Sequence, residues 1–479
     1  MRVFLSGLLS LVAGNFLALI LNFIFAIILL QRLSAADYGL QSTLVAFSAI
    51  AISFSDLGLF DFSMRELARQ PRDALRETFS SLLTLRLLLA CVVCLVAFAI
   101  ALLANSFRGP QVVILLLALF TLVLSFAPTA MIEALLGATG RTQRIALLQG
   151  IYSVGTVIAG VALLAAGADL TTLYLAFAVL SAVVIVLYLM EARRILPEGF
   201  GLRWQPRAWS AALRQALPGG LGSACLTFCL RFSTYLVYTF VSQEGAGYIG
   251  LSNQLYQAMI VLIWSPFAIS ILPVLSRLHT QSEARLQWLS GRSVTWLLAA
   301  VLPVTVGGVL LAPELLDVLK PGSGRIIAPT MQILLWVLPL DILQGFLYRI
   351  LLVLGWQRAY LQSAVTALVV NIALCLTLIP AFGVQGAVAA TVGSVAVVVA
   401  LCTWRLRRWL FPNLRRADAA RLLIALGGMS FAVLAAREWW FGWRIALGGA
   451  VYLALLFGSR LFTRADWRES RVLVQPERV

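Results

Sequence analysis

Runs of about 20 apolar residues, the length at which an α-helix crosses the hydrocarbon core of a bilayer, recur throughout this chain. Backbone groups find no water inside a bilayer, so continuous runs of this length are expected to be helical. Only 12% of the residues are charged, about half the share in a soluble domain. The sequence therefore predicts an all-α polytopic membrane protein. We predict fourteen transmembrane helices, at residues 8–30, 40–60, 81–104, 111–134, 145–166, 170–190, 217–241, 250–272, 293–312, 328–351, 360–380, 384–404, 421–436 and 443–462.

The second half of the chain repeats features of the first. Matching segments lie 210 to 216 residues apart, and one shared spacing is harder to obtain by chance than a single match among Gly- and Leu-rich helices. An even number of helices in each half makes the two repeats parallel, related by an axis along the membrane normal. The matching pairs are 140–149 with 355–362, 37–39 with 247–250, and 167–169 with 383–385.

The repeat predicts four parts. They are a six-helix half (1–190), a cytoplasmic linker (191–216), a second six-helix half (217–404), and an extra helix pair with a cytoplasmic tail (405–479). The linker spaces Trp204, Trp209 and Leu213 as an amphipathic helix on the inner leaflet would. The alternative is a plain solvated linker.

Basic residues outnumber acidic ones, 36 to 20, and lie mainly in short loops between apolar runs. With both termini in the cytoplasm, 27 basic residues fall on the cytoplasmic side and 6 on the other, as the positive-inside rule requires. They form no separate basic domain, so we expect no nucleic-acid partner.

Several kinds of chemistry lack their residues in this sequence. All six cysteines fall inside apolar runs, which favours packing over a metal site. No phosphate-binding loop for ATP is present, and the single histidine, His279, lies in a predicted loop. No large extracytoplasmic loop offers paired carboxylates for acid–base catalysis. We expect no cofactor, no metal and no enzymatic activity.

Ionisable residues inside membrane spans are costly and usually face a cavity or a partner. The sequence offers Asp56, Arg86, Glu133, Arg231, Asp341 and Arg349. Arg231 is the best placed, and its counterpart in the repeat lies near Asn22. A guanidinium in a cavity can bind a phosphate through two hydrogen bonds. The alternative for Arg231 is a structural ion pair with Asp56, Glu133 or Asp341.

The other charged candidates have two interpretations each. Arg86 either lines a cavity or extends to the cytoplasmic headgroups, and for Arg349 we favour the headgroups. Asp56 and Asp341 are candidates for ion coupling or for ion pairs, with Arg65 or Arg69 as local partners of Asp56. We expect Glu133, close to a helix end, to be interfacial.

Uncharged polar residues add to the predicted lining. The uncharged candidates are Asn15, Asn22, Tyr235, Tyr238, Asn253, Gln254, Tyr256 and Gln257. Hydrogen bonding between helices is the alternative role for these residues.

Four segments resemble bacterial polysaccharide-repeat flippases of the Wzx type, which translocate O-antigen and exopolysaccharide units. These segments are 33–39 (Leu-Ser-Ala-Ala-Asp-Tyr-Gly), 55–59 (Ser-Asp-Leu-Gly-Leu), 65–69 (Arg-Glu-Leu-Ala-Arg) and 383–391 (Gly-Val-Gln-Gly-Ala-Val-Ala-Ala-Thr). That group belongs to the multidrug/oligosaccharidyl-lipid/polysaccharide exporter superfamily. The likeness extends over nearly the whole chain, although each motif is degenerate.

The resemblance implies a V-shaped carrier of the bacterial inner membrane that alternates between inward-open and outward-open states. Its substrate would be an undecaprenyl-pyrophosphate-linked oligosaccharide, and its partners would include membrane lipids and polysaccharide polymerase or assembly proteins. A cationic cavity is typical of such families and fits Arg231 and Arg86. The nearest alternative is a cation-coupled multidrug exporter of the same superfamily. A membrane polysaccharide polymerase or glycosyltransferase is a second one.

Overall fold

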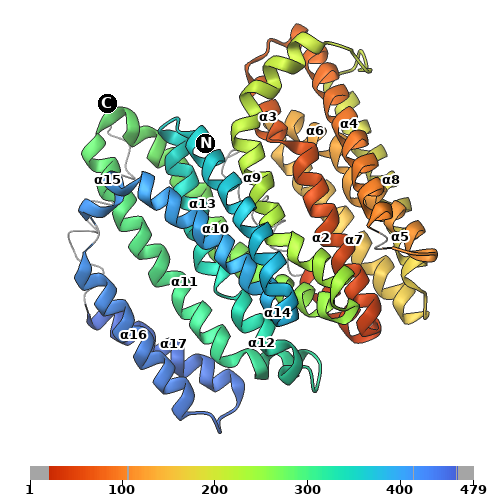
Figure 1. Cartoon of the computed structure of the whole chain (residues 1–479). Helices are drawn as coiled ribbons and strands as arrows, with labels where there is room; N and C mark the ends of the chain where they lie inside the picture. Colours follow the sequence, from red (N-terminus) through yellow and green to blue (C-terminus); the bar gives the residue numbers. More distant parts are fainter. Residues whose placement is uncertain (1–20, 105–106, 414, 460, 462–479) are drawn as a thin grey trace. The chain divides into compact units, whose positions relative to one another are not determined.

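The computed structural model describes residues 21–104, 107–413, 415–459 and 461, and within them every regular element is a helix (Figure 1). Within these described ranges, eleven helical segments are long and apolar enough to cross a membrane. The chain is therefore an all-α multi-pass membrane protein. Its elements are α2 (Ala35–Asp56), α3 (Leu59–Arg69), α4 (Arg72–Leu103), α5 (Pro110–Ala118), the π-helix η1 (Leu119–Leu124), α6 (Phe126–Ala138), α7 (Thr142–Ala165), α8 (Leu170–Ile195), α9 (Pro206–Phe240), α10 (Gln243–Gln281), α11 (Glu283–Leu319), α12 (Gly324–Leu334), α13 (Val337–Val353), α14 (Gln357–Arg405), α15 (Arg407–Leu410), η2 (Phe411–Asn413), α16 (Arg416–Ala435) and α17 (Phe441–Gly458).

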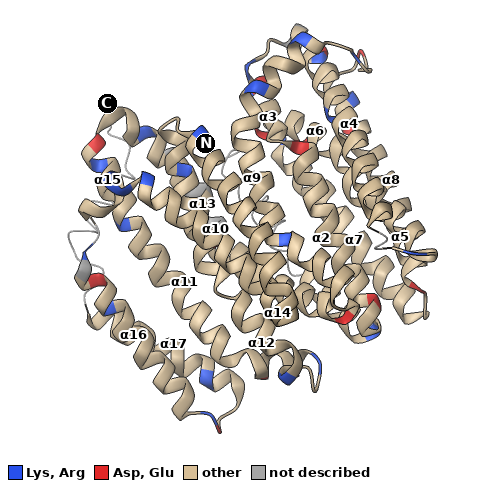
Figure 2. Cartoon of the chain, viewed as in Figure 1, with Lys and Arg blue, Asp and Glu red and all other residues tan. Residues whose placement is uncertain are grey.

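Several predicted spans need adjustment. The first, 8–30, lies mostly outside the described residues, and its described part belongs to the short apolar helix Leu21–Arg32. By contrast, the predicted division between spans 360–380 and 384–404 is confirmed, because Gly383 (φ 56°, ψ −128°) leaves helical geometry and separates the two helical parts of α14. The span 40–60 is interrupted after Asp56, where Leu57 (φ 44°) and Gly58 (φ 80°) leave helical geometry before α3 begins. Charged residues lie mainly near helix ends in both units (Figure 2).

Backbone geometry supports the repeat. Gly140 and Gly355 both have φ 73°, a left-handed conformation that suits glycine. The residues after them, Arg141 (φ −93°, ψ 41°) and Trp356 (φ −91°, ψ 37°), begin α7 and α14 in nearly the same way. Corresponding sequences therefore build the same turn before corresponding helices.

The chain forms two compact units, Met1–Gln254 and Leu255–Val479, which meet within α10. This boundary lies beyond the linker that the repeat predicts at 191–216. Residues 206–216 of that linker form the first turns of α9, which runs without interruption to Phe240. The four parts that the repeat predicts are not tested by this division into two units, and they remain a prediction.

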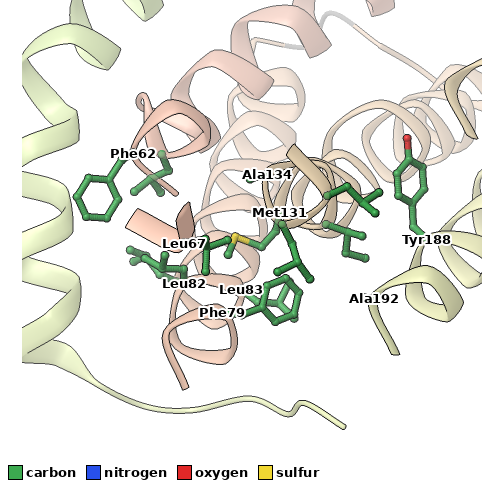
Figure 3. Close-up of a cluster of buried hydrophobic side chains, with 14 of the residues drawn as sticks. Phe62, Leu67, Phe79, Leu82, Leu83, Met131, Ala134, Tyr188 and Ala192 are labelled. Carbon is green, nitrogen blue, oxygen red and sulfur yellow. The ribbon is translucent and has the colours of Figure 1, made fainter. Parts of the chain in front are cut away.

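The core of the first unit gathers side chains from α3, α4, α6, α8 and the start of α9 (Figure 3). Trp209 belongs to this core, and its indole donates hydrogen bonds of 3.0 Å to the carbonyl and the hydroxyl of Ser81. Trp204, by contrast, is 70% exposed. The start of α9 is therefore anchored to α4 by a buried aromatic residue.

Glycines let α2 approach α9 and α10 closely. A Cβ on Gly220 would lie 1.9 Å from the carbonyl carbon of Leu57, and one on Gly39 would lie 1.8 Å from the carbonyl oxygen of Gln243. Small residues at such crossings are the usual means by which membrane helices pack backbone against backbone. Both ends of α2 are therefore fixed by contacts that tolerate no side chain.

In the second unit, α16 and α17 pack against α11 around an apolar cluster that includes Ala299, Met429 and Tyr452. The Tyr452 hydroxyl donates to the carbonyl of Ala299 over 2.7 Å. Near one end of α11, Arg292 pairs with Asp418 over 2.5 Å. The extra helix pair is thus held by polar contacts as well as by apolar packing.

Candidate functional site

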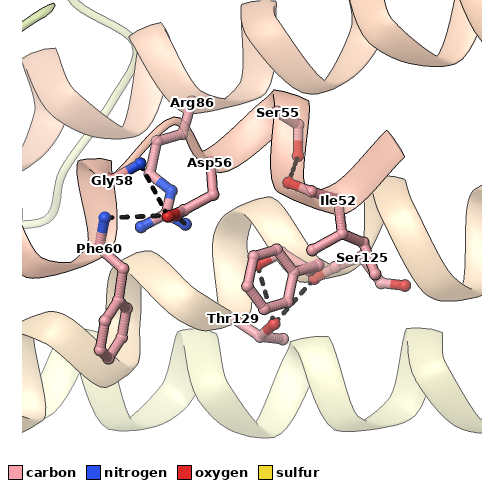
Figure 4. Close-up of polar contacts among 9 residues, drawn as sticks. Ile52, Ser55, Asp56, Gly58, Phe60, Arg86, Ser125 and Thr129 are labelled. Atoms are coloured by element: carbon pink, nitrogen blue, oxygen red, sulfur yellow. Dashed lines mark hydrogen bonds and ion pairs between the residues drawn. The ribbon is translucent and has the colours of Figure 1, made fainter. Parts of the chain in front are cut away.

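The first unit contains a buried ion pair between α4 and the end of α2. Arg86 Nη2 lies 2.5 Å from Asp56 Oδ1, and the Arg86 side chain is 2% exposed (Figure 4). Because Leu57 and Gly58 turn the chain, the Asp56 carboxylate also accepts hydrogen bonds from the backbone amides of Gly58 and Phe60, each over 3.2 Å. Asp56 therefore caps α3, where the positive end of the helix dipole favours a carboxylate.

This pairing decides between the interpretations that the sequence left open. Arg86 is buried and does not extend to the headgroups. Asp56 takes Arg86 as its partner, so the expected local pairing with Arg65 or Arg69 was wrong. The Arg86 guanidinium also lies over the ring of Phe126, 5.8 Å from its centroid. Its Nη1 has no hydrogen-bond partner among the described residues.

A second carboxylate, Glu133 of α6, interacts electrostatically with Arg86. Its Oε1 accepts a hydrogen bond of 2.5 Å from the Tyr188 hydroxyl and one of 3.0 Å from the Gln149 amide. We expected Glu133 at the interface because the predicted span ended at residue 134. The helix α6 continues to Ala138, about one turn beyond the predicted end of the span, and the position of Glu133 relative to the interface stays a prediction.

Glu133 lines a cavity of about 290 Å³ within the first unit. Nine of its twelve lining residues, from η1, α6, α7 and α8, carry a hydroxyl, amide or carboxyl group, although most of the lining surface is apolar. Within the described residues, the buried Thr121 hydroxyl has no hydrogen-bond partner. The lining residues are Thr121, Leu122, Ser125, Phe126, Thr129, Glu133, Gln149, Tyr152, Ser153, Ser181, Val184 and Tyr188.

The predicted residues of α9 lie apart from this cavity lining. Arg231 is partly buried, and its role in substrate binding stays a prediction. Tyr235 stacks on Phe47 of α2, with ring centroids 5.3 Å apart. Tyr238 stacks on Phe107 at 5.5 Å. Both tyrosines therefore have packing contacts that explain their burial without a ligand.

The remaining candidates are distributed over other helices. Asn22 is exposed, Asn253 is buried and Gln257 is partly buried. Asp341 of α13 accepts a short hydrogen bond from the Tyr256 hydroxyl, which ties α13 to α10 inside the second unit. None of these contacts tests a role in substrate binding, and the assignments remain predictions.

Arg349 of α13 packs against an aromatic ring of the same unit. Its guanidinium carbon lies 4.6 Å from the centroid of the Trp264 ring, and its Nη1 donates to the Gly345 carbonyl over 3.2 Å. These contacts give the side chain partners within the protein, where we had favoured the lipid headgroups.

The network around Glu133 was the main feature that sequence reasoning missed. Glu133 is itself an ionisable residue in a predicted span, and Gln149 belongs to the repeated segment. Their proximity depends on how α6, α7 and α8 pack, which hydropathy does not report. Among the described residues, no group of three or more histidines, cysteines or acids is arranged to hold a metal ion.

Comparison with known proteins places this geometry in a family. The structure resembles the lipid II flippase MurJ in an inward closed conformation, with a TM-score of 0.76, 14% identity, and coverage of 95% of this chain and 98% of that one. It also resembles an inward-facing multidrug resistance MATE family transporter of the MOP superfamily, with a TM-score of 0.63, 15% identity, and coverage of 82% and 94%. A third similar structure is a mutant of the Vibrio cholerae MATE transporter VcmN, with a TM-score of 0.58, 14% identity, and coverage of 85% and 97%.

These likenesses establish a shared fold. The sequence matches no curated protein at a significant level. A family model described as polysaccharide biosynthesis protein matches residues 4–279, more than half of the 479 residues. The chain therefore belongs to the polysaccharide biosynthesis protein family and has the fold of MOP-superfamily transporters.

Proposed function

We propose that this protein is a flippase that moves undecaprenyl-pyrophosphate-linked oligosaccharide units from the inner to the outer leaflet of the bacterial inner membrane. The observation that carries the proposal is the combination of a polysaccharide-biosynthesis family match with a lipid II flippase as a structural neighbour. Family membership points to sugar polymers, and the neighbour translocates a lipid. A lipid-linked sugar unit is the substrate class that both have in common.

The chemistry of such a substrate explains why arginines matter. A pyrophosphate is a dense anion, and a guanidinium binds it through paired, charge-assisted hydrogen bonds. Arg231 is our first candidate for this contact, because it lies within the apolar part of α9. We propose both termini on the cytoplasmic side, from the 27-to-6 distribution of basic residues. The proposed role is transport by alternating access, without catalysis.

Deletion of the gene tests the proposal. We expect lipid-linked oligosaccharide units to accumulate on the inner leaflet and surface polysaccharide to be lost, with both effects reversed by the wild-type gene. A deletion strain with normal surface polysaccharide and no accumulated intermediate would contradict the function.

A matched pair of variants tests the arginine. Arg231→Ala should abolish complementation, and Arg231→Lys should restore part of it because the charge remains. Arg207→Ala is the control, since Arg207 is an exposed arginine near the start of the same helix. Full activity of Arg231→Ala at normal expression would remove this residue from the site.

The second candidate is a cation-coupled multidrug exporter, favoured by the likeness to MATE family transporters. A cationic drug would need an acidic partner. Asp56 is already neutralised by Arg86, which leaves Asp341 of α13 as the predicted acid for this role. Hypersensitivity of the deletion strain to cationic drugs, with normal lipid-linked sugars, would favour this candidate over the flippase.

A further inference from the structure

We propose that Glu133 is a proton-binding site within the first unit. A proton from the aqueous phase binds its Oε2 and is released again during the working cycle. The observations that carry the proposal are a free carboxylate oxygen, a cavity that Glu133 lines together with hydroxyl-bearing residues, and a charge imbalance. The site goes beyond the proposed flippase function, because it is defined without reference to the substrate.

The charge imbalance comes from two carboxylates that share one guanidinium. Arg86 of α4 forms an ion pair with Asp56 of α2, and it also interacts electrostatically with Glu133 of α6. The other titratable groups facing Glu133 are the phenols of Tyr188 on α8 and Tyr152 on α7, which are neutral at physiological pH. With both carboxylates ionised, the group carries a net charge of −1 inside a membrane span. Isolated charge there is strongly disfavoured, and one bound proton removes it.

The hydrogen bonds of Glu133 leave one oxygen available. Tyr188 and Gln149 both donate to Oε1. Within the described part of the chain, no hydrogen bond reaches Oε2. When hydronium gives its proton to Oε2, a water molecule leaves and the carboxylate becomes a neutral acid. Oε1 then serves as its carbonyl oxygen and still accepts both bonds, so protonation requires no rearrangement of the donors.

The cavity supplies the route for the proton. A volume of about 290 Å³ has room for several water molecules, and hydroxyl groups such as those of Thr121, Ser125 and Thr129 give them hydrogen-bond partners within a mainly apolar lining. Part of that lining comes from η1, a π-helical turn that widens the helix between α5 and α6. Such turns are rare and frequently occur at functional sites. The buried Thr121 hydroxyl on this turn, unpaired within the described residues, is available to a water molecule.

A proton suits this site better than a metal ion. The Arg86 guanidinium beside Glu133 repels a second cation, whereas a proton on Oε2 makes the residue neutral. The described residues also lack a cluster of acids, histidines or cysteines that would coordinate a metal. Binding of sodium at Glu133 is therefore the outcome that would contradict the proposal.

Carbodiimide labelling of the purified wild-type protein tests the site without a substrate or a mutation. Dicyclohexylcarbodiimide reacts with protonated carboxylic acids in apolar surroundings. We expect modification at Glu133, mapped by mass spectrometry, to increase as pH falls and to be unaffected by sodium. The reference within the same protein is Glu191, which is paired with Arg194 and Arg144 near the end of α8. No modification at Glu133, or protection by sodium at constant pH, would overturn the proposal.

Infrared difference spectra between two pH values give an independent readout. Wild-type protein should show the carbonyl stretch of a protonated carboxylic acid, and Glu133→Gln should lose it. Glu191→Gln should keep the signal. Glu133→Asp retains an acid and should keep a signal at a changed pH midpoint, which covers the case in which Glu133→Gln fails to fold. An unchanged signal in a folded Glu133→Gln protein would contradict the assignment. Because these measurements use protein alone, their outcome is separate from that of the flippase experiment.

Discussion

Two buried arginine–aspartate pairs, one in each unit, have the same distance of 2.5 Å and different surroundings. In the second unit, the side chains of Arg292 and Asp418 are only 1% and 2% exposed. In the first unit, the side chain of Asp56 is 20% exposed, and its partner Arg86 also faces Glu133. The second pair is enclosed, whereas the first belongs to a group with one acid in excess.

The partners around each pair explain the contrast. Asp418 also accepts a bond of 3.1 Å from Arg421, and Arg292 also donates to the Leu461 carbonyl over 3.1 Å. The Arg292–Asp418 pair joins α11 to α16, and the bond to Leu461 joins α11 to the segment that follows α17. Arg86 interacts electrostatically with two acids, of which Glu133 lines a cavity. The second pair therefore links elements within its unit, whereas the first belongs to the group that we propose to be titratable.

The largest effect should come from breaking the enclosed pair. Asp418→Leu leaves the Arg292 guanidinium buried without its acid, and loss of one partner of a buried pair costs about 3–5 kcal/mol. We expect a corresponding loss of unfolding free energy in detergent, measured by thermal or denaturant unfolding. The double variant Arg292→Met/Asp418→Leu should recover most of it, because apolar residues then fill the space. A single variant as stable as the wild type would show that the pair is not a structural link.

The pair in the first unit should have a smaller effect on stability and a larger one on transport. Arg86→Ala removes a charge-assisted hydrogen bond from Asp56, an interaction of about 1.5–3 kcal/mol, and Asp56 keeps its two backbone donors. We expect loss of complementation by Arg86→Ala and partial activity of Arg86→Lys, with protein amount measured in the same cells. If Arg86→Ala transports normally while Asp418→Leu does not, the roles that we assign to the two pairs are reversed.

The close crossing that holds Asp56 in place provides the next test. In Gly220→Ala the new Cβ would lie 1.9 Å from the carbonyl carbon of Leu57, so α2 and α9 must separate. Overpacking of this kind costs about 1–3 kcal/mol, measured by unfolding in detergent. The control is Gly150→Ala on α7, whose Cβ would meet no atom within 4 Å. Alanine favours a helix by up to about 1 kcal/mol over glycine, so this control should be neutral or stabilising. Equal stability of the two variants would contradict the close approach.

The sequence predicts the helices better than the site, for a physical reason. Apolar length and the repeat depend on composition along the chain, so most spans and the Gly140 and Gly355 turns were accessible without a structure. The break at Leu57 and the π-helical turn were not, because hydropathy does not change where a helix bends. Arg86 and Asp56 are both visible in the sequence, but their pairing across 30 residues depends on how α2 packs against α4. The predicted end of the span at residue 134 was about one turn short of the observed end of α6 at Ala138.

An exposed acid gives the smallest effect and sets the scale for the buried ones. Asp169 accepts hydrogen bonds from the Thr172 hydroxyl (2.5 Å) and backbone amide (3.1 Å) at the start of α8. These bonds, the hydroxyl one foremost, hold the pKa of Asp169 below its ordinary value of 3.8. A lowered folded-state pKa means that the ionised cap stabilises the protein above pH 3.8 and that this contribution is lost as pH falls through the folded-state pKa.

Two substitutions separate the cap from its charge. Asp169→Ala should lower the unfolding free energy by about 1 kcal/mol or less, as loss of an exposed cap does. Asp169→Asn keeps an oxygen acceptor at the same position, so it should be nearly as stable as the wild type and should lack this residue's pH dependence. Melting temperatures of the wild type and Asp169→Asn, compared across the acidic range, should converge as the wild-type cap becomes protonated. A constant difference would show that Asp169 stabilises α8 through hydrogen bonds that do not depend on its charge. Its contribution would then be independent of pH, unlike that of the excess acid beside Arg86.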